Sequence, residues 1–272
     1  MRVAVAQVAS STDPAENLGT VAEFAERARA DGAQLVVFPE ATMASFDTRS
    51  RDVAQPLGGP WGSEVRRIAA DVGIVIVVGM FTTAGDDKVR NTLLATGPGV
   101  EASYDKIHLF DAWGFRESDH VEAGSQPTIV RIADAEVGLT TCYDLRFPEL
   151  FTFYGHAGAQ VILVPASWAN GPQKVDHWRT LAVARALDST CFVVAAGQAD
   201  PTSVGRSVKA GSPTGVGHSV VVGPSGQVRA EAGEAPELLV VDLDLAEVDA
   251  VRRQLPVLAN ARFTVTPPSV SR

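Results

Sequence analysis

Apolar runs and amphipathic segments alternate from the first residues of the chain. The segment RVAVAQV (2–8) predicts a strand, and apolar positions three and four residues apart in the next stretch predict a helix. Asp13 can cap this helix at its N-terminus, Pro14 suits its first turn, and Gly32 ends it. The continuous apolar run AQLVVFPE (33–40) then predicts a buried strand. The chain is therefore expected to open with a strand–helix–strand unit.

The same alternation continues along the rest of the chain. Strands are predicted over 74–81, 137–142, 160–167 and 191–198, and helices over 60–73, 147–158, 174–190 and 245–255. Two segments in which apolar runs reverse at Gly/Pro turns predict β-hairpins, over 90–104 and 218–231. Strand–helix units combined with hairpins favour an α/β fold in which helices pack outside a mixed sheet.

The chain shows no boundary between domains, so one domain over residues 1–272 is predicted. The longest loop-like segment, 199–217, is rich in Gly, Ser and Pro and lies between two predicted core strands. A loop of this length in a compact domain is often a functional lid, and a surface excursion is an equally open interpretation.

Composition and charge narrow the class of protein. Hydrophobic residues make up 46% and charged residues 20% of the chain, which is typical of a folded globular protein. A formal net charge of −9 with scattered basic residues argues against binding to nucleic acid. The first ten residues are too briefly apolar for a secretory signal, and no run approaches the roughly 18 apolar residues of a membrane span. With Cys142 and Cys191 as the only thiols, no disulfide framework is expected, which favours a reduced, cytoplasmic location.

Four polar residues are predicted to lie where apolar strands finish: Glu40, Lys106, Glu117 and Cys142. Loops at the carboxyl ends of strands can bring distant side chains together without disturbing the core. The sequence therefore predicts that these four residues form one site.

Cys142 is the natural nucleophile of such a site, because a thiolate attacks an acyl carbon and forms a thioester that water can cleave. A free thiol has a pKa of about 8.5, so a base must take its proton at neutral pH. None of the five histidines belongs to a recognisable Cys/His signature, whereas Glu40, desolvated behind an apolar run, can serve as general base. Lys106 and the backbone N–H of Tyr143 can then stabilise the negative carbonyl oxygen.

Several segments in this order resemble the nitrilase superfamily of carbon-nitrogen hydrolases: VVFPEATM, YDKIHLFD, FRES, CYDLRFPEL, GHSVVVGPSGQV and RRQLPV. The likeness is greatest to the branch with omega-amidase and deaminated glutathione amidase. It implies a four-layer α-β-β-α sandwich that dimerises, and a Glu-Lys-Cys triad at Glu40, Lys106 and Cys142 with a second glutamate at Glu117. It also implies no metal and no organic cofactor. The expected reaction is cleavage of a small carboxamide to a carboxylate and ammonia.

Other interpretations of these residues stay open at this point. Arg146 could bind a substrate carboxylate or pair with Asp144 or Glu149 to fix the turn, and the structural role is slightly favoured. His177 could line the substrate pocket or simply pack. Cys191 lies in a continuous apolar strand and is expected to be inert.

Other functions also stay open. The same reactive residues would serve an N-carbamoyl amide hydrolase or a nitrilase, and a catalytically silent scaffold of the same fold is a further alternative. A redox thiol is disfavoured because no resolving cysteine is visible near Cys142.

Overall fold

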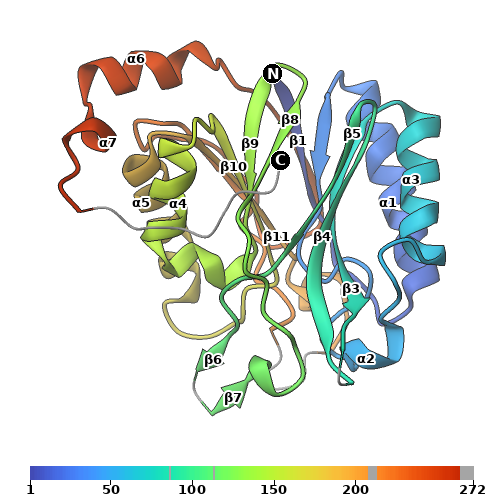
Figure 1. The fold of residues 1–272 in the computed structure, drawn as a ribbon. Coiled ribbons are helices and arrows are strands. Elements are labelled where there is room, and N and C mark those ends of the chain that lie inside the picture. The colour runs from blue at the N-terminus through green and yellow to red at the C-terminus, as the bar shows by residue number, and fades with distance from the viewer. Residues whose placement is uncertain (86, 113, 208–212, 264–272) are drawn as a thin grey trace.

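Two β-sheets lie face to face between two layers of helices in the computed structural model, which describes residues 1–85, 87–112, 114–207 and 213–263 (Figure 1). The order of layers is helix, sheet, sheet, helix, so the predicted four-layer α-β-β-α sandwich is confirmed. No helix within the described ranges is both long and apolar enough to cross a lipid bilayer.

The first sheet has six strands, with a parallel centre and antiparallel flanks. Their order is β14 (Glu237–Asp242), β1 (Arg2–Gln7), β2 (Leu35–Val37), β3 (Val75–Thr83), β4 (Val89–Gly97) and β5 (Val100–Asp105). Its outer face is covered by α1 (Pro14–Ala30) and α3 (Pro60–Val72), with the short α2 (Ser50–Val53) nearby.

The second sheet also has six strands, and its parallel centre is β9 to β11. Their order is β13 (Val228–Glu231), β12 (Val220–Val222), β11 (Phe192–Gly197), β10 (Val161–Ala166), β9 (Ala135–Leu139) and β8 (Thr128–Ile132). Its outer face is covered by α4 (Pro148–His156) and α5 (Lys174–Ser189), followed along the chain by α6 (Ala246–Gln254) and α7 (Val257–Asn260).

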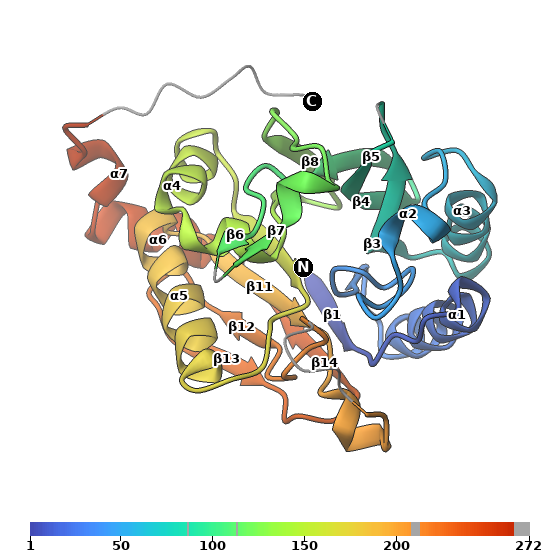
Figure 2. The ribbon, with the colours of Figure 1, turned by 90° about the horizontal axis from the view of Figure 1, so that it is seen from below.

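Shorter elements complete the chain. A small hairpin of β6 (Asp111–Ala112) and β7 (Phe115–Arg116) lies at the lower end of the sandwich, between its two halves when seen from below (Figure 2). The described residues also form short 3₁₀-helices, η1 (Glu117–Asp119), η2 (Cys142–Arg146) and η3 (Pro201–Val204).

The alternating side chains of each strand build two kinds of core. In β1, Val3 and Val5 face the second sheet and pack with Val137 and Leu163, whereas Ala4 and Ala6 face the helices. Strands buried on both faces need apolar residues at every position. This explains why the central strands β2, β10 and β11 are continuous apolar runs without a polar face.

Most of the predicted elements are confirmed, including the start of α1, where the Asp13 carboxylate accepts a hydrogen bond from the backbone N–H of Ala15. Two strands of the large sheets, β8 and β14, have no counterpart in the prediction, and both lie at an edge of their sheet. β14 is half-exposed and pairs antiparallel with β1, and its segment ELLVVD lacks the clear alternation of a half-buried strand.

The structure corrects two of the predicted strand ends. Strand β9 ends at Leu139, so Cys142 opens η2 instead of closing the strand. Glu117 lies in η1 after the exposed hairpin strand β7, not at the end of an apolar strand. Part of the predicted loop 199–217, residues 208–212, lies outside the described residues.

Candidate active site

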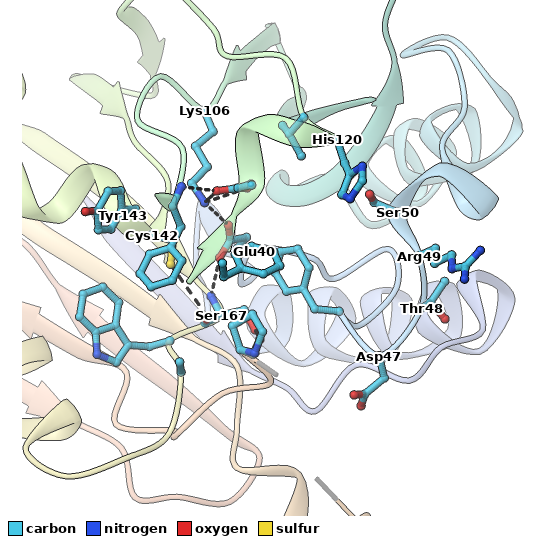
Figure 3. Close-up of a pocket in the computed structure, with 18 of the residues that line it drawn as sticks. Glu40, Asp47, Thr48, Arg49, Ser50, Lys106, His120, Cys142, Tyr143 and Ser167 are labelled. Atoms are coloured by element: carbon cyan, nitrogen blue, oxygen red, sulfur yellow. Dashed lines mark hydrogen bonds and ion pairs between the residues drawn. The ribbon is translucent and has the colours of Figure 1, made fainter. Parts of the chain in front are cut away.

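A cavity of about 750 Å³ opens where loops that follow strands of both sheets meet. Glu40, Lys106 and Cys142 line it (Figure 3). Glu117 lines it as well, so the structure brings the four predicted residues together. Phe115 of the β6–β7 hairpin contributes to its wall. Residues that are 102 positions apart in sequence, Glu40 and Cys142, thus share one pocket.

Lys106 lies between two carboxylates and is only 3% exposed. Its Nζ donates to Glu40 Oε1 at 3.1 Å and to Glu117 Oε2 at 2.8 Å. Burial alone would lower the pKa of Lys106, but attraction to Glu117 and Glu40 outweighs burial and holds that pKa well above its ordinary value. The side chain is therefore a fixed ammonium that can donate to an oxyanion in the cavity.

The Glu40 carboxylate is held by three hydrogen-bond donors. Oε1 accepts from Lys106 and, at 2.7 Å, from the side-chain amide of Asn91, while Oε2 accepts from the backbone N–H of Ser167 at 2.8 Å. Charge-assisted hydrogen bonds of this kind fix both the position and the orientation of a carboxylate. The donors come from both sheets, because Asn91 lies in β4 and Ser167 follows β10.

The backbone around Glu40 packs directly against β3 at Gly79. A Cβ atom at Gly79 would lie 2.7 Å from the Ala41 nitrogen and 2.8 Å from the Glu40 Cα. Ala41 itself has a φ of +57°, in the left-handed region that side chains rarely adopt. The chain after β2 therefore turns sharply across β3, and only glycine leaves room for it there.

Cys142 lies at a sharp turn between β9 and η2, with a φ of +47°. Its Sγ is 3.9 Å from the Ser167 carbonyl oxygen. Burial and the negative charge of Glu40 raise the pKa of Cys142 well above its usual value, and the opposing effect of Lys106 does not compensate. The resting side chain is thus a neutral thiol, which needs a base such as Glu40 before it can attack.

Glu117 is the second carboxylate that binds Lys106. Its Oε2 accepts from the Lys106 ammonium and, at 2.6 Å, from the backbone N–H of Phe110. Glu117 is 6% exposed despite its place in a charged segment. Its contact with Lys106 suits a role in holding the ammonium.

Asp144 joins the turn of Cys142 to the loop of Lys106. The buried carboxylate accepts from the backbone N–H of Thr141 at 2.8 Å, from the Tyr104 hydroxyl at 2.7 Å and from the His108 backbone N–H at 3.0 Å. The His108 ring also lies 2.7 Å from it, through Nδ1. Among the described residues Arg146 forms no ion pair with Asp144, whose carboxylate is surrounded by other donors, or with Glu149. The structure therefore gives no support to the slightly favoured interpretation that Arg146 pairs with one of them to fix the turn.

The remaining predicted residues fall into two groups. Tyr143 and Arg146 line the cavity, and the Arg146 guanidinium lies 5.0 Å from the centroid of the Trp168 ring. Tyr143 lies in the first turn of η2, where backbone N–H groups have no acceptor within the turn. His177 is exposed on α5 and is not among the described residues that line this cavity.

Sequence reasoning missed several residues of the site. Asn91 and Ser167 bind Glu40, and Lys174 lines the cavity one helical turn before His177. Asn91 lies two residues before an apolar run in a predicted hairpin, which is a weak signal for a buried amide. Ser167 acts through its backbone N–H, which no sequence motif can reveal.

Metal binding requires several ligands within reach of one ion. Among residues 1–85, 87–112, 114–207 and 213–263, no three His, Cys, Asp or Glu side chains are grouped so that they could hold one. The prediction that the reaction needs no cofactor stays a prediction.

Comparison with known proteins agrees with this geometry. A family model described as carbon-nitrogen hydrolase matches residues 2–253. The chain belongs to the carbon-nitrogen hydrolase family. This places it in the family that the strand-end motifs resemble.

Relatives of this carbon-nitrogen hydrolase cover nearly its whole length. A hydrolase of Mycobacterium tuberculosis is 52% identical over 96% of this chain and 95% of its own. A deaminated glutathione amidase of Escherichia coli O157:H7 is 35% identical over 97% of this chain and 98% of its own. A solved variant of the amidase from Nesterenkonia sp. AN1, with acrylamide added at its active-site cysteine, is 30% identical and covers 94% and 98% with a TM-score of 0.76.

Proposed function

We propose that this carbon-nitrogen hydrolase cleaves a small carboxamide to a carboxylate and ammonia through a thioester on Cys142. The observation that carries the proposal is the placement of a neutral thiol, a carboxylate and a fixed ammonium around one cavity. The related Nesterenkonia amidase, whose active-site cysteine carries a covalent adduct, supports Cys142 as nucleophile.

The first half of the reaction forms the acyl-enzyme. Glu40 takes the proton of the Cys142 thiol as the sulfur attacks the amide carbon, so an S–C bond forms and the carbonyl oxygen becomes negative. The Lys106 ammonium and the Tyr143 N–H stabilise that oxygen. When the C–N bond breaks, the amide nitrogen takes the proton from Glu40 and leaves as ammonia.

The second half releases the acid. Glu40 takes a proton from a water molecule, whose oxygen attacks the thioester carbon and forms a second oxyanion at the same donors. Collapse breaks the S–C bond and returns the proton from Glu40 to the Cys142 sulfur. Glu117 keeps Lys106 in place through both halves.

The cations of the cavity favour an amide whose acyl part carries a carboxylate. Besides Lys106, the cavity is lined by the basic side chains of Arg49, Arg51, Arg146 and Lys174. A guanidinium matches a carboxylate with two parallel hydrogen bonds. The related deaminated glutathione amidase of Escherichia coli supports the same class of omega-amide. Carbamoyl amides and nitriles are the alternative substrates of the same reacting groups.

A substrate panel tests both parts of the proposal. Ammonia release is measured with omega-amides that carry a distal carboxylate and with neutral amides of equal length, for wild type, Cys142→Ala and Arg146→Gln. We expect Cys142→Ala to abolish turnover, and Arg146→Gln to raise KM for the anionic amides about tenfold or more while sparing the neutral ones. Full amide turnover by Cys142→Ala would refute the thioester route.

We further propose that the enzyme acts in the cytoplasm as a homodimer. Two free thiols without a disulfide suit a reducing compartment, and the resemblance to the nitrilase superfamily supports dimerisation. Light scattering of the purified protein distinguishes a dimer from a monomer of 28.6 kDa.

A further inference from the structure

A buried asparagine lies between the two carboxylates of the site. Asn91, in β4, is 1% exposed, and its Nδ2 donates to Glu40 Oε1 at 2.7 Å and reaches Glu117 Oε1 at 3.4 Å. Lys106 donates to the same two oxygens at 3.1 Å each. The amide and the ammonium are thus two donors to the same pair of acceptors.

The orientation of the Asn91 amide leaves one of its buried polar atoms without a hydrogen bond. The Oδ1 atom of Asn91 is buried and has no hydrogen-bond partner in the part of the chain that the structure describes. A flipped amide would turn Oδ1 toward Glu40, where oxygen would face oxygen. The donor edge is therefore fixed by the carboxylates, and the unpaired oxygen is the consequence.

The charges of the site explain why such a donor matters. Glu40 and Glu117 share one ammonium, so the buried group has one negative charge in excess when both carboxylates are ionised. Two buried carboxylates close together tend to retain a proton, and a protonated Glu40 cannot accept one from Cys142. Hydrogen bonds to the ionised form oppose this tendency.

We propose that Asn91 is a positioning residue that keeps Glu40 deprotonated and aimed at Cys142 at neutral pH. This inference rests on the proposed role of Glu40 as the base. Oε1 of Glu40 is occupied by two donors, whereas Oε2 has one described donor, the Ser167 N–H. A carboxylate oxygen offers about two lone-pair sites, so Oε2 is the oxygen that receives the thiol proton.

Alkylation of Cys142 by iodoacetamide reports this function without any amide substrate. Glu40 takes the thiol proton, the sulfur attacks the CH₂ carbon, an S–C bond forms, and the C–I bond breaks to release iodide. The charged and titratable groups that face Glu40 are Lys106, Glu117 and Cys142. The reaction needs the base Glu40, so its rate is expected to fall on the acidic side of the pH–rate profile.

The experiment measures the alkylation rate of Cys142 against pH, by peptide mapping, in wild type, Asn91→Leu and Asn91→Asp. Leucine removes the donor at similar volume, and aspartate keeps the shape but places an oxygen opposite Glu40. We expect both variants to move the acidic limb to higher pH by about one unit or more, because each leaves the carboxylates less stabilised. Thr96→Val is the control, since it removes a buried hydroxyl of the same strand that bonds Glu101.

The pH dependence of alkylation distinguishes a positioning role of Asn91 from a structural one. A purely structural role would slow alkylation by the same factor at every pH, and an unmoved limb in a folded Asn91 variant overturns the proposal. If neither variant folds, carboxyl ¹³C signals of wild type decide, since a protonated Glu40 at pH 7 contradicts it. A shifted limb in an enzyme that hydrolyses no amide would instead sink the proposed function and leave the role of Asn91 standing.

Discussion

The chemistry of single residues in this site is set by their neighbours. Cys142 is a neutral thiol because burial and Glu40 raise its pKa, and Lys106 is an ammonium because two carboxylates outweigh its burial. A catalytic cysteine whose pKa is lowered by its surroundings is already a thiolate before substrate binds. Here proton transfer and attack belong to one step, so the base is as necessary as the sulfur.

Glu40→Gln tests this coupling. The glutamine side chain keeps the shape of glutamate but cannot accept the thiol proton, so we expect kcat to fall by about 10³-fold or more. Alkylation of Cys142 near pH 7 should slow as well, because the thiol has lost its base. Ammonia release and alkylation are measured on the same preparation. A variant that alkylates as fast as wild type would mean that the thiol is activated by another group.

At the scale of elements, the site depends on how the chain leaves each strand. The turn after β2 crosses β3 at Gly79, and the turn after β9 is closed by Asp144, which also holds the loop of Lys106. These contacts fix the backbone on either side of the reacting groups. Misplacement of a reacting group by about 1 Å can cost about 10²-fold in rate.

Gly79→Ala tests the crossing. The new Cβ would press on the backbone of Glu40 and Ala41, which cannot move as a flexible side chain would. We expect kcat to fall at least tenfold, with a loss of about 1–3 kcal/mol in the free energy of unfolding. Gly19→Ala in α1 is the matched control, because its Cβ would meet nothing within 4 Å and should leave kcat unchanged. A wild-type kcat in Gly79→Ala would show that the backbone at Glu40 and Ala41 can shift to accommodate the new Cβ without moving the reacting groups.

Patterns along the chain predict the elements well and the contacts between them poorly. Continuous apolar runs and the Asp13 cap mark strands and the first helix, because burial and capping act over a few residues. The resemblance to a known family adds the order of the layers and the four polar residues of the site. Asn91 and the Ser167 N–H escape prediction, because their roles arise only when β4 and the end of β10 meet Glu40.

At the scale of the whole molecule, the site exists only where the two sheets face each other. Glu40 and Lys106 follow strands of the first sheet, whereas Cys142 and Ser167 follow strands of the second. The interior core that joins the sheets draws on both, with Val5 and Val37 packed among Val137 and Val194. Loss of packing between the two sheets would therefore also disrupt the site.

The buried thiol of Cys191 makes the stability of the fold depend on pH. The thiol is fully buried and contacts Arg252 of α6 at 3.4 Å. Burial, despite the opposing effect of Arg252, raises the pKa of Cys191 to about 11. The group favours folding while it is protonated in both states. That contribution is lost as pH rises above the ordinary thiol value toward 11, since only the unfolded thiol then ionises.

Equilibrium unfolding in urea at pH 7.5 and pH 10 measures this loss. We expect wild type to lose about 2 kcal/mol more between the two pH values than Cys191→Ala does, because pH 10 lies about 1.5 units above the ordinary thiol pKa of about 8.5, where only the unfolded chain has ionised this thiol. The cavity left by alanine lowers stability equally at both pH values and cancels in the comparison. Cys142 is present in both proteins, so its own alkaline contribution cancels too. Equal losses in the two proteins would mean that the Cys191 thiol ionises as readily in the folded state as in the unfolded chain.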